Sequence, residues 1–465
     1  MKRIYWQSIT LILAVTLFTT GCKKFLERPP EGQMTEEEAL KDENGVLEFL
    51  NGEYTLLGDG DFMGGRLQSL TDMLADELDG SRFTGDFSEI YKRQNSIFGD
   101  VRNNFYKKGY RIINVANGVL RKISLVSAGN ADNVKGQALF FRGVAHFELV
   151  RLFAQPWGYT SDNSHYGIPL RNEIVIGSVQ RATVKQVYDQ VIADLKDAET
   201  LLPETFTGNY KATRWAAKAY LAKVYFQMND FANAYKYAAE IAANSMFVPD
   251  ASHSSRFSPG LSREGILVIA NEATRFQPGS ELRGNYRSDL NIPVLNFTSQ
   301  FYSVVNADPL DVRKSWYSNT LQSGYYVTTK YNKDFFDLPI VHLTEIKLIL
   351  AESGAEIASS DAAALTNAIT NLNQLLTRAY GGTARNLAPN ATAALVISTA
   401  RRERELELVA EGNRYHEIKR IGARNGTNVD RRGSAWNCNG FILQFPKGEQ
   451  DAFAPFIMNP EGGCF

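Results

Sequence analysis

The sequence predicts a mainly α-helical protein in which paired helices flank an irregular, aromatic-rich stretch. Three observations predict this fold class. Apolar residues recur at helical spacing, in pairs of segments, between residues 105 and 244 and again between 341 and 421. That periodicity disappears between residues 250 and 340, where Pro, Gly, Asn and aromatic residues dominate. The chain has 465 residues, of which 44% are hydrophobic, so it is long enough to bury a large core.

The first 21 residues have the pattern of a secretory signal peptide. Lys2 and Arg3 give a positive start, an apolar run covers residues 9–18, and small residues precede Cys22. The run is shorter than the roughly 20 residues that span a bilayer as a helix. We therefore predict cleavage before Cys22, a lipid anchor on its thiol, and a tether over residues 22–34. The alternative is an ordinary signal peptide with an incidental Cys.

The other two cysteines, Cys438 and Cys464, both lie in the C-terminal tail. In an oxidising compartment they could form a disulfide, which would close a loop of about 26 residues and stabilise the protein by about 3 kcal/mol. Two free thiols are the alternative, and the sequence does not separate the two.

The mature chain begins with predicted helices. Thr35 followed by three acids is a helix start with a capping box, and apolar residues continue at helical spacing through Tyr54. A second helix is expected over Arg66 to Leu78. Residues 79–98 mix Gly, Asp and aromatic residues without a period, so we predict a loop there.

Apolar periodicity in the central part of the chain, residues 105–243, predicts helical hairpins. Helices are expected over residues 105–127, 133–153 and 183–203, and a further pair lies between Lys211 and Ala243. In that last pair, large and small residues alternate at the offsets of a tetratricopeptide repeat, a hairpin of about 34 residues. The residues that carry this pattern are Leu221, Ala222, Tyr225, Phe231, Ala234, Ala238 and Ile241. A similar pairing over 341–358 and 361–379 gives four predicted helix pairs.

The irregular stretch from residue 250 to 340 is the best candidate for a functional region. Structureless segments this long inside a globular chain are usually functional or disordered, and its aromatic content argues against disorder. Short strands are expected at 265–270 and 325–330.

The last predicted helix covers residues 393–421. Glu403, Glu407 and Glu411 fall on one of its faces at four-residue steps. Two such carboxylates could serve as the acid and base of a glycosidase. The favoured alternative is a structural ion-pair network between neighbouring helices, whose expected partners are Arg404 and Arg414.

Several motifs, in order, resemble those of the SusD/RagB family of bacterial outer-membrane nutrient-binding lipoproteins. The late helix carries most of them: Glu403-Arg404, Glu407-Leu408, Glu411-Gly412, Arg414-Tyr415, Glu417-Ile418 and Lys419-Arg420. Others are Phe25-Leu26-Glu27 after Cys22, the run from Arg142 to Phe153, Val187-Tyr188, Asp194-Leu195, Leu202-Pro203, Leu343 to Glu352, and Asn459-Pro460. The resemblance covers essentially the whole chain.

The resemblance implies a helical SusD-like fold, with one domain over residues 35–465. It implies tetratricopeptide-like repeats on one side, where a partner packs, and a ligand site on the opposite loop-rich face. The implied partner is a SusC-like TonB-dependent outer-membrane transporter, to which the lipoprotein delivers an oligosaccharide or, in some members, a peptide. The family is not enzymatic, and the anchored protein is expected to face the cell exterior.

Ligand-contact candidates come from the two aromatic loops. Sugar rings stack on aromatic side chains, and their hydroxyls need polar partners. The candidates are Arg82, Phe83, Tyr91, Tyr286, Arg287, Trp316 and Tyr325. Trp316 is the strongest because polar residues surround it, and packing is the alternative role for each.

Other chemistry has little support in the sequence. The five His show no metal-ligand spacing, there is no Cys-x-x-Cys, and no Gly-rich phosphate loop precedes a helix, so we expect no metal and no cofactor. The net charge of −1 gives no footprint for nucleic-acid binding. A secreted glycosidase and a repeat adaptor without a nutrient ligand remain the alternatives.

Overall fold

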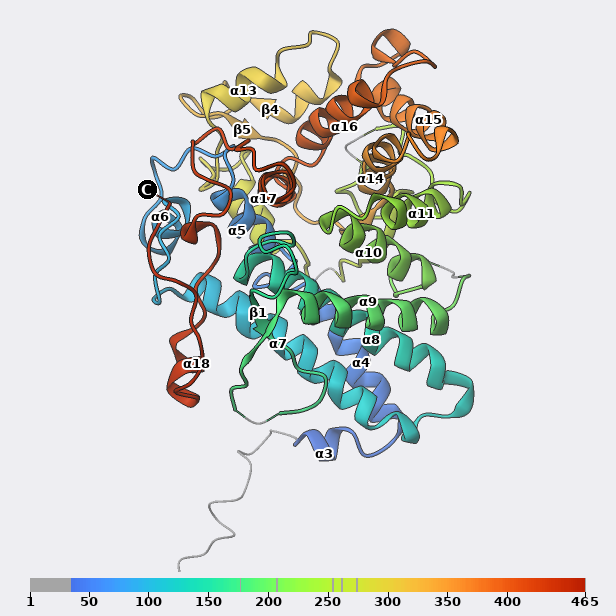
Figure 1. Cartoon of the computed structure of the whole chain (residues 1–465), viewed down its shortest axis with the longest axis vertical. Helices are drawn as coiled ribbons and strands as arrows, with labels where there is room; N and C mark the ends of the chain where they lie inside the picture. Colours follow the sequence, from blue (N-terminus) through green and yellow to red (C-terminus); the bar gives the residue numbers. More distant parts are fainter. Residues whose placement is uncertain are drawn as a thin grey trace, which may run out of the picture.

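The computed structural model describes residues 35–464, apart from residues 176, 206–207, 253–254, 261 and 273–274. The predicted signal peptide, the lipid-anchor candidate Cys22 and the tether to residue 34 lie outside the described residues. The described part is mainly helical, as predicted (Figure 1).

The N-terminal helical segment is two helices and not one. Thr35 caps α3 (Glu36–Ala39) through the predicted capping box. The prediction of one continuous helix through Tyr54 is wrong, because the side chain of Asp42 starts a second helix, α4 (Glu43–Leu57). A cap inside an apolar period is hard to detect because the apolar spacing continues on both sides of it.

The next two elements also differ from the prediction. Helix α5 (Arg66–Leu74) ends before Leu78, because Ala75 takes an extended backbone conformation. The predicted loop over 79–98 contains a short helix, α6 (Gly85–Tyr91). Seven residues that begin with Gly give too few turns for a helical period to be visible.

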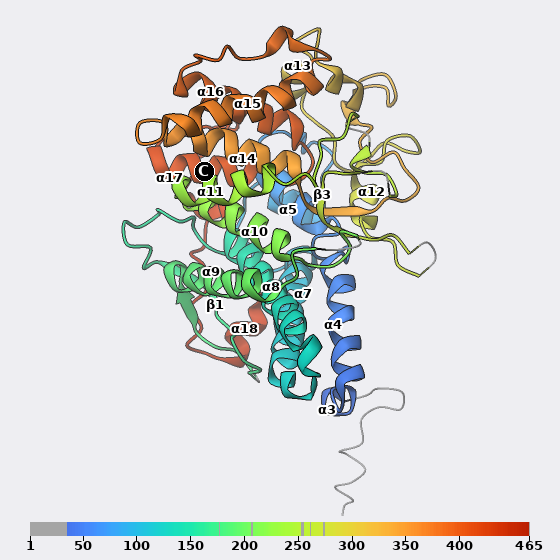
Figure 2. The ribbon, with the colours of Figure 1, turned by 90° about the vertical axis from the view of Figure 1, so that its right-hand side faces the viewer.

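Antiparallel helices build the scaffold in sequence order. They are α7 (Asp100–Arg121), α8 (Ala128–Phe153), α9 (Val184–Leu201), α10 (Arg214–Gln227) and α11 (Phe231–Ala242). Each packs on the next, and α11 then packs on α14, so the stack continues through the irregular region to the C-terminal helices. Figure 2 shows this stack rising from α8 and α9 through α10 to α14 and α15.

The stack ends with α14 (Leu343–Glu356), α15 (Ala362–Ala379) and α16 (Ala393–Glu407), and α14 packs against both of the others. Small residues let these helices approach closely. A Cβ on Gly354 of α14 would lie 2.8 Å from the carbonyl oxygen of Ala364 at the start of α15. The predicted helix pairs are confirmed.

Residues 250–340 form a layer of short elements beside the stack, visible at the right of Figure 2. The longest pairing is antiparallel, between β3 (Gly265–Ile269) and β6 (Leu338–His342), so the predicted strand at 265–270 is confirmed. The two-residue strands β4 (Tyr317–Ser318) and β5 (Val327–Thr328) also pair. Of these, β5 lies within the predicted strand segment 325–330, and β4 was not predicted. Helices α12 (Ser280–Tyr286) and α13 (Ser299–Val305) complete this loop-rich region.

The predicted single helix over 393–421 is wrong: it is α16 followed by α17 (Arg414–Asn425). Ala410 and Gly412 take φ values of +58° and +77°, a left-handed conformation that no helix continues through. Gly412 is also confined, since a Cβ there would lie 2.6 Å from the Thr71 hydroxyl. The C-terminal part of the predicted helix is therefore a separate helix, α17, that runs in a different direction from α16.

The remaining elements are short. They are β1 (Tyr166–Pro169) paired with β2 (Arg181–Thr183), α18 (Lys447–Ala452), and 3-10 turns at Ile123–Leu125, Val312–Trp316, Thr383–Arg385 and Asn439–Phe441. Cys438 and Cys464 form a disulfide in the C-terminal tail. Within the described ranges, no helix has the length and apolarity needed to cross a membrane.

Candidate ligand cleft

A cleft of about 430 Å³ opens in the loop-rich region. Three parts of the chain form it: Ser252 and Phe257, the 3-10 turn that ends at Trp316, and the residues that follow β5. Its lining is mixed, with hydroxyl, amide and ammonium groups beside apolar ones. The lining residues are Ser252, Phe257, Val312, Ser315, Trp316, Thr329, Lys330, Asn332 and Lys333.

Trp316, the strongest sequence-based candidate, lines this cleft. Its backbone carbonyl accepts hydrogen bonds from the Thr328 hydroxyl at 3.0 Å and from the Thr329 amide at 2.7 Å, which fixes the residue at the open end of the β4–β5 hairpin. Its side chain is largely covered, with a relative exposure of 7%. The ammonium of Lys330 lies 4.5 Å from the ring centroid. Trp316 therefore forms part of the cleft wall and presents only a small part of its indole.

Lys330 was not predicted, and it connects the cleft to the break between α16 and α17. Its Nζ donates hydrogen bonds to Glu411 at 2.5 Å and to the carbonyls of Glu407 and Val409. Burial lowers the pKa of Lys330, while the Glu411 carboxylate opposes that shift. All three N–H donors of this ammonium group are engaged in these bonds. Lys330 therefore holds the cleft wall in place against residues 407–411.

Beneath the cleft lies a buried ion-pair network that joins α16 to the loop-rich region. Glu407 accepts from Arg256 at 2.8 Å and from Arg378 at 2.8 Å, and Arg313 lies 3.3 Å from its other oxygen. Glu403 pairs with the same Arg313 at 2.7 Å. The predicted network of carboxylates exists, and its cations come mainly from the loop-rich region.

The predicted partners of these carboxylates are different residues. Arg404 lies 4.0 Å from Glu417, and Arg414 pairs with Asp76 at 2.8 Å. The prediction failed because the break at residue 410 turns α17 away from α16. A glycosidase pair would need accessible carboxylates about 5 to 9.5 Å apart. Here Glu407 is buried against three guanidinium groups.

Arg82 and Tyr325, from different predicted loops, do come together. The guanidinium of Arg82 lies 5.0 Å from the centroid of the Tyr325 ring, and it also donates to the Pro293 carbonyl at 3.1 Å. Neither residue lines the cleft. They form a separate surface contact near the turn of the β4–β5 hairpin.

The other candidates divide between packing and the rim. Tyr286 has no exposed surface, and its hydroxyl donates to Asp72 at 2.5 Å. Phe83 is buried, and its ring packs edge-on against the ring of Tyr91. Both side chains therefore have a packing role. Arg287 donates to the Lys333 carbonyl at 3.1 Å, which places it behind the rim of the cleft.

Of the residues that line the cleft, only Trp316 was predicted; those missed are Ser252, Phe257, Val312, Ser315, Thr329, Lys330, Asn332 and Lys333. Lys330 had one signal, since it ends a predicted strand, but nothing in the sequence indicated that this strand passes Trp316. Among the described residues, no group of three or more His, Cys, Asp or Glu side chains could hold a metal ion.

Comparisons with known proteins give consistent results. A family model described as starch-binding associating with outer membrane matches residues 24–226, and the SusD family model matches residues 285–454. SusD-like protein P2 of Formosa agariphila is 28% identical over 239 residues, which span 50% of this chain and 45% of that protein. The match thus covers about half the length of the curated relative.

Solved structures share the fold. A SusD superfamily protein from Bacteroides thetaiotaomicron superposes with a TM-score of 0.76 at 22% identity, covering 90% of this chain and 100% of that one. A Bacteroides vulgatus protein described as sugar binding gives a TM-score of 0.74 at 26% identity, covering 90% and 98%. With the two family models matching successive parts of the sequence, this chain belongs to the SusD/RagB family.

Proposed function

We propose that this protein is a non-enzymatic outer-membrane lipoprotein that captures an oligosaccharide and delivers it to a SusC-like TonB-dependent transporter. Family membership supports the general assignment to carbohydrate binding and nutrient uptake at the outer membrane. The names of the similar proteins, SusD-like and sugar binding, point the same way. The lipid on Cys22 would hold the protein at the membrane, facing the cell exterior.

The observation that carries the proposal is the composition of the cleft around Trp316. Pyranose faces are weakly apolar, and Trp316, Phe257 and Val312 offer apolar contacts. Sugar hydroxyls need donors and acceptors of fixed geometry. Asn332 has such a geometry, because its side chain is held by the Ser288 amide at 2.8 Å and by the Ser288 hydroxyl.

Calorimetric titration with a panel of oligosaccharides and peptides tests this proposal. We expect saturable binding of a glycan, with no cleavage products in the mixture afterwards. Trp316→Phe should weaken that binding about tenfold, because the smaller ring loses contact area in the cleft. The matched control is Trp436→Phe, the same change at a partly exposed Trp outside the cleft.

The alternatives predict different results. Cleavage products would support a glycosidase, and they should disappear in a variant of the true catalytic carboxylates. An adaptor would bind no member of the panel, and Trp316→Phe would leave its partner binding intact. Binding of peptides and not glycans would keep the capture role and change the ligand class. Co-purification with a SusC-like transporter tests the partner separately.

A further inference from the structure

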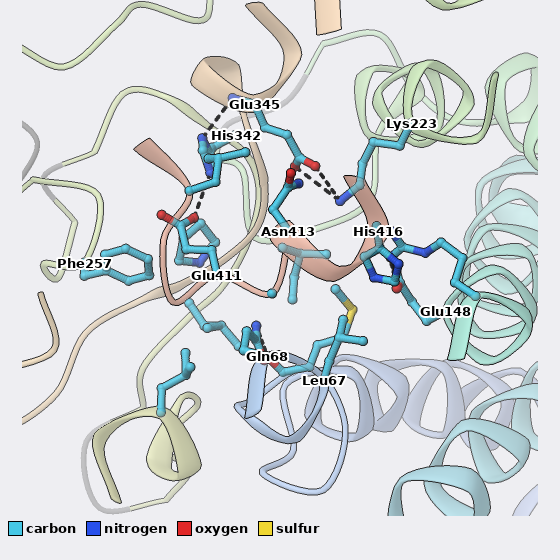
Figure 3. A pocket seen from close by; sticks show the side chains of 18 of the residues that line it. Leu67, Gln68, Glu148, Lys223, Phe257, His342, Glu345, Glu411, Asn413 and His416 are labelled. Carbon is cyan, nitrogen blue, oxygen red and sulfur yellow. Dashed lines mark hydrogen bonds and ion pairs between the residues drawn. The ribbon is translucent and has the colours of Figure 1, made fainter. Parts of the chain in front are cut away.

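A second, smaller cavity of about 60 Å³ lies between α5, α8, α10 and the break between α16 and α17 (Figure 3). Phe257 lines both this inner cavity and the ligand cleft. The break between α16 and α17 supplies one wall, and helices α5, α8 and α10 supply others. The polar lining residues are Gln68, Glu148, Arg151, Lys223, His342, Glu345, Glu411, Asn413 and His416.

Five of the residues that line this cavity each carry one buried polar side-chain atom without a hydrogen-bond partner among the described residues. They are Gln68 Oε1, Glu148 Oε1, Arg151 Nε, Asn413 Oδ1 and His416 Nε2. Each unpaired group of this kind costs about 1–3 kcal/mol when it is buried away from water. Five such atoms around one cavity indicate a ligand that satisfies them.

The charges of the lining are already paired. Glu148 forms an ion pair with Arg151, and Lys223 lies 3.1 Å from Glu345. Glu411 pairs with Lys330 at 2.5 Å and accepts from His342 at 3.1 Å. A bound ion would therefore bring an uncompensated charge into a buried site, which is strongly unfavourable. This balance favours a neutral ligand.

The five atoms also require a ligand that both donates and accepts. Glu148 Oε1 and Gln68 Oε1 accept hydrogen bonds, whereas Arg151 Nε donates one. Burial lowers the pKa of His416 well below its usual range, so its ring is neutral and Nε2 can be either donor or acceptor. Water combines both functions in a volume that fits the space.

The position of Asn413 gives the site a structural role. Asn413 immediately precedes α17, yet its side chain makes no capping hydrogen bond. A helix start leaves several backbone N–H groups without a partner inside the helix. Water bound to Asn413 Oδ1 would therefore lie at the end of α17 where capping is missing.

We propose that the inner cavity is a binding site for a cluster of about four ordered waters. The cluster satisfies the five unpaired atoms and supports the start of α17 behind the ligand cleft. This inference is independent of the identity of the captured nutrient.

Crystallography at about 1.5 Å resolution tests the proposal directly. We expect separate density peaks within hydrogen-bond distance of Glu148 Oε1, Asn413 Oδ1 and His416 Nε2. Crystals soaked in sodium bromide or rubidium chloride should show no anomalous peak in the cavity. An anomalous peak in the cavity would show that it binds an ion and not water, and would overturn the proposal. A cavity without any density would overturn it as well.

A pair of variants gives a second test in solution. His416→Phe puts an apolar ring where water would bind, whereas His416→Gln keeps a polar group near the position of Nε2. If the cavity is hydrated, the Tm of the Phe variant should be lower than that of the Gln variant by roughly 2 °C or more. A dry cavity predicts the opposite order, because removing an unpaired buried polar group is then favourable.

Discussion

The helical stack and the loop-rich region differ in the contacts that dominate their packing. Within the stack, apolar side chains and small residues such as Gly354 bring antiparallel helices into close contact. The loop-rich region has little regular structure, and its junction with α16 is built from buried charges around Glu407. Ion pairs occur in the stack as well, such as Arg142 of α8 with Asp194 of α9 at 2.6 Å, but they join helices that already pack along their length. An irregular segment needs directional bonds to fix where its side chains lie.

Two buried carboxylates, Glu264 and Asp72, show how strongly a nearby guanidinium group changes a pKa. Burial alone would raise the pKa of Glu264, but the guanidinium groups of Arg256 and Arg378 lower it to about 2. For Asp72 on α5, burial is the largest effect and raises the pKa from 3.8 to about 7, although the Tyr286 hydroxyl and the charge of Lys330 oppose it. Glu264 thus stays charged, whereas Asp72 is largely protonated in mildly acidic solution.

The largest expected effect is that of Glu407→Gln. This change leaves three buried guanidinium groups facing a neutral amide, and breaking a buried ion pair in this way costs about 3–5 kcal/mol. The free energy of unfolding, measured by urea titration, should fall by that amount. Hydrogen exchange should rise first in residues 312–333. A loss below 1 kcal/mol would contradict the role given to the network.

The next effect is a pH dependence. Because the pKa of Asp72 is raised in the folded state, its contribution to stability is full below about 3.8 and is lost as pH rises toward about 7. Asp72→Asn should remove this dependence. The free energy of unfolding of the variant, relative to the unmodified protein, should therefore increase by a few kcal/mol between pH 4 and pH 7.5. A constant difference across that range would show that Asp72 is ionised throughout.

A smaller effect tests the stack. Gly354→Ala places a methyl group against the Ala364 carbonyl, and overpacking of this kind costs about 1–3 kcal/mol. The matched control is Gly52→Ala in α4, where a Cβ would meet no atom within 4 Å. The control should be neutral or stabilising by about 0.5–1 kcal/mol. Equal effects of the two variants, measured as changes in Tm, would contradict close packing at Gly354.

The smallest expected effect is that of Asp189→Asn on α9. Asp189 pairs with Lys185 at 2.7 Å, but both side chains are more than half exposed. Such surface pairs contribute about 0.5 kcal/mol or less. Urea titration in low and high salt should detect almost no change, in contrast to Glu407→Gln. A loss comparable to that variant would remove the distinction between exposed and buried charges.

The sequence predicted most of the helical stack, because apolar periodicity is a local property of each helix. It did not predict the breaks at Asp42 and at Ala410, since the apolar spacing continues across the first and depends on tertiary contacts at the second. Trp316 was found from its polar surroundings. Lys330 could not be found from the sequence, because its role depends on hydrogen bonds to carbonyls about 80 residues away along the chain.

The central claim is that the cleft beside Trp316 takes the captured nutrient. The most direct measurement is a crystal structure of the protein with the oligosaccharide that binds most tightly in calorimetry. We expect a sugar ring in contact with Trp316, with hydroxyls bonded to Asn332 or Lys333. A sugar bound elsewhere on the molecule, with this cleft empty, would contradict the account.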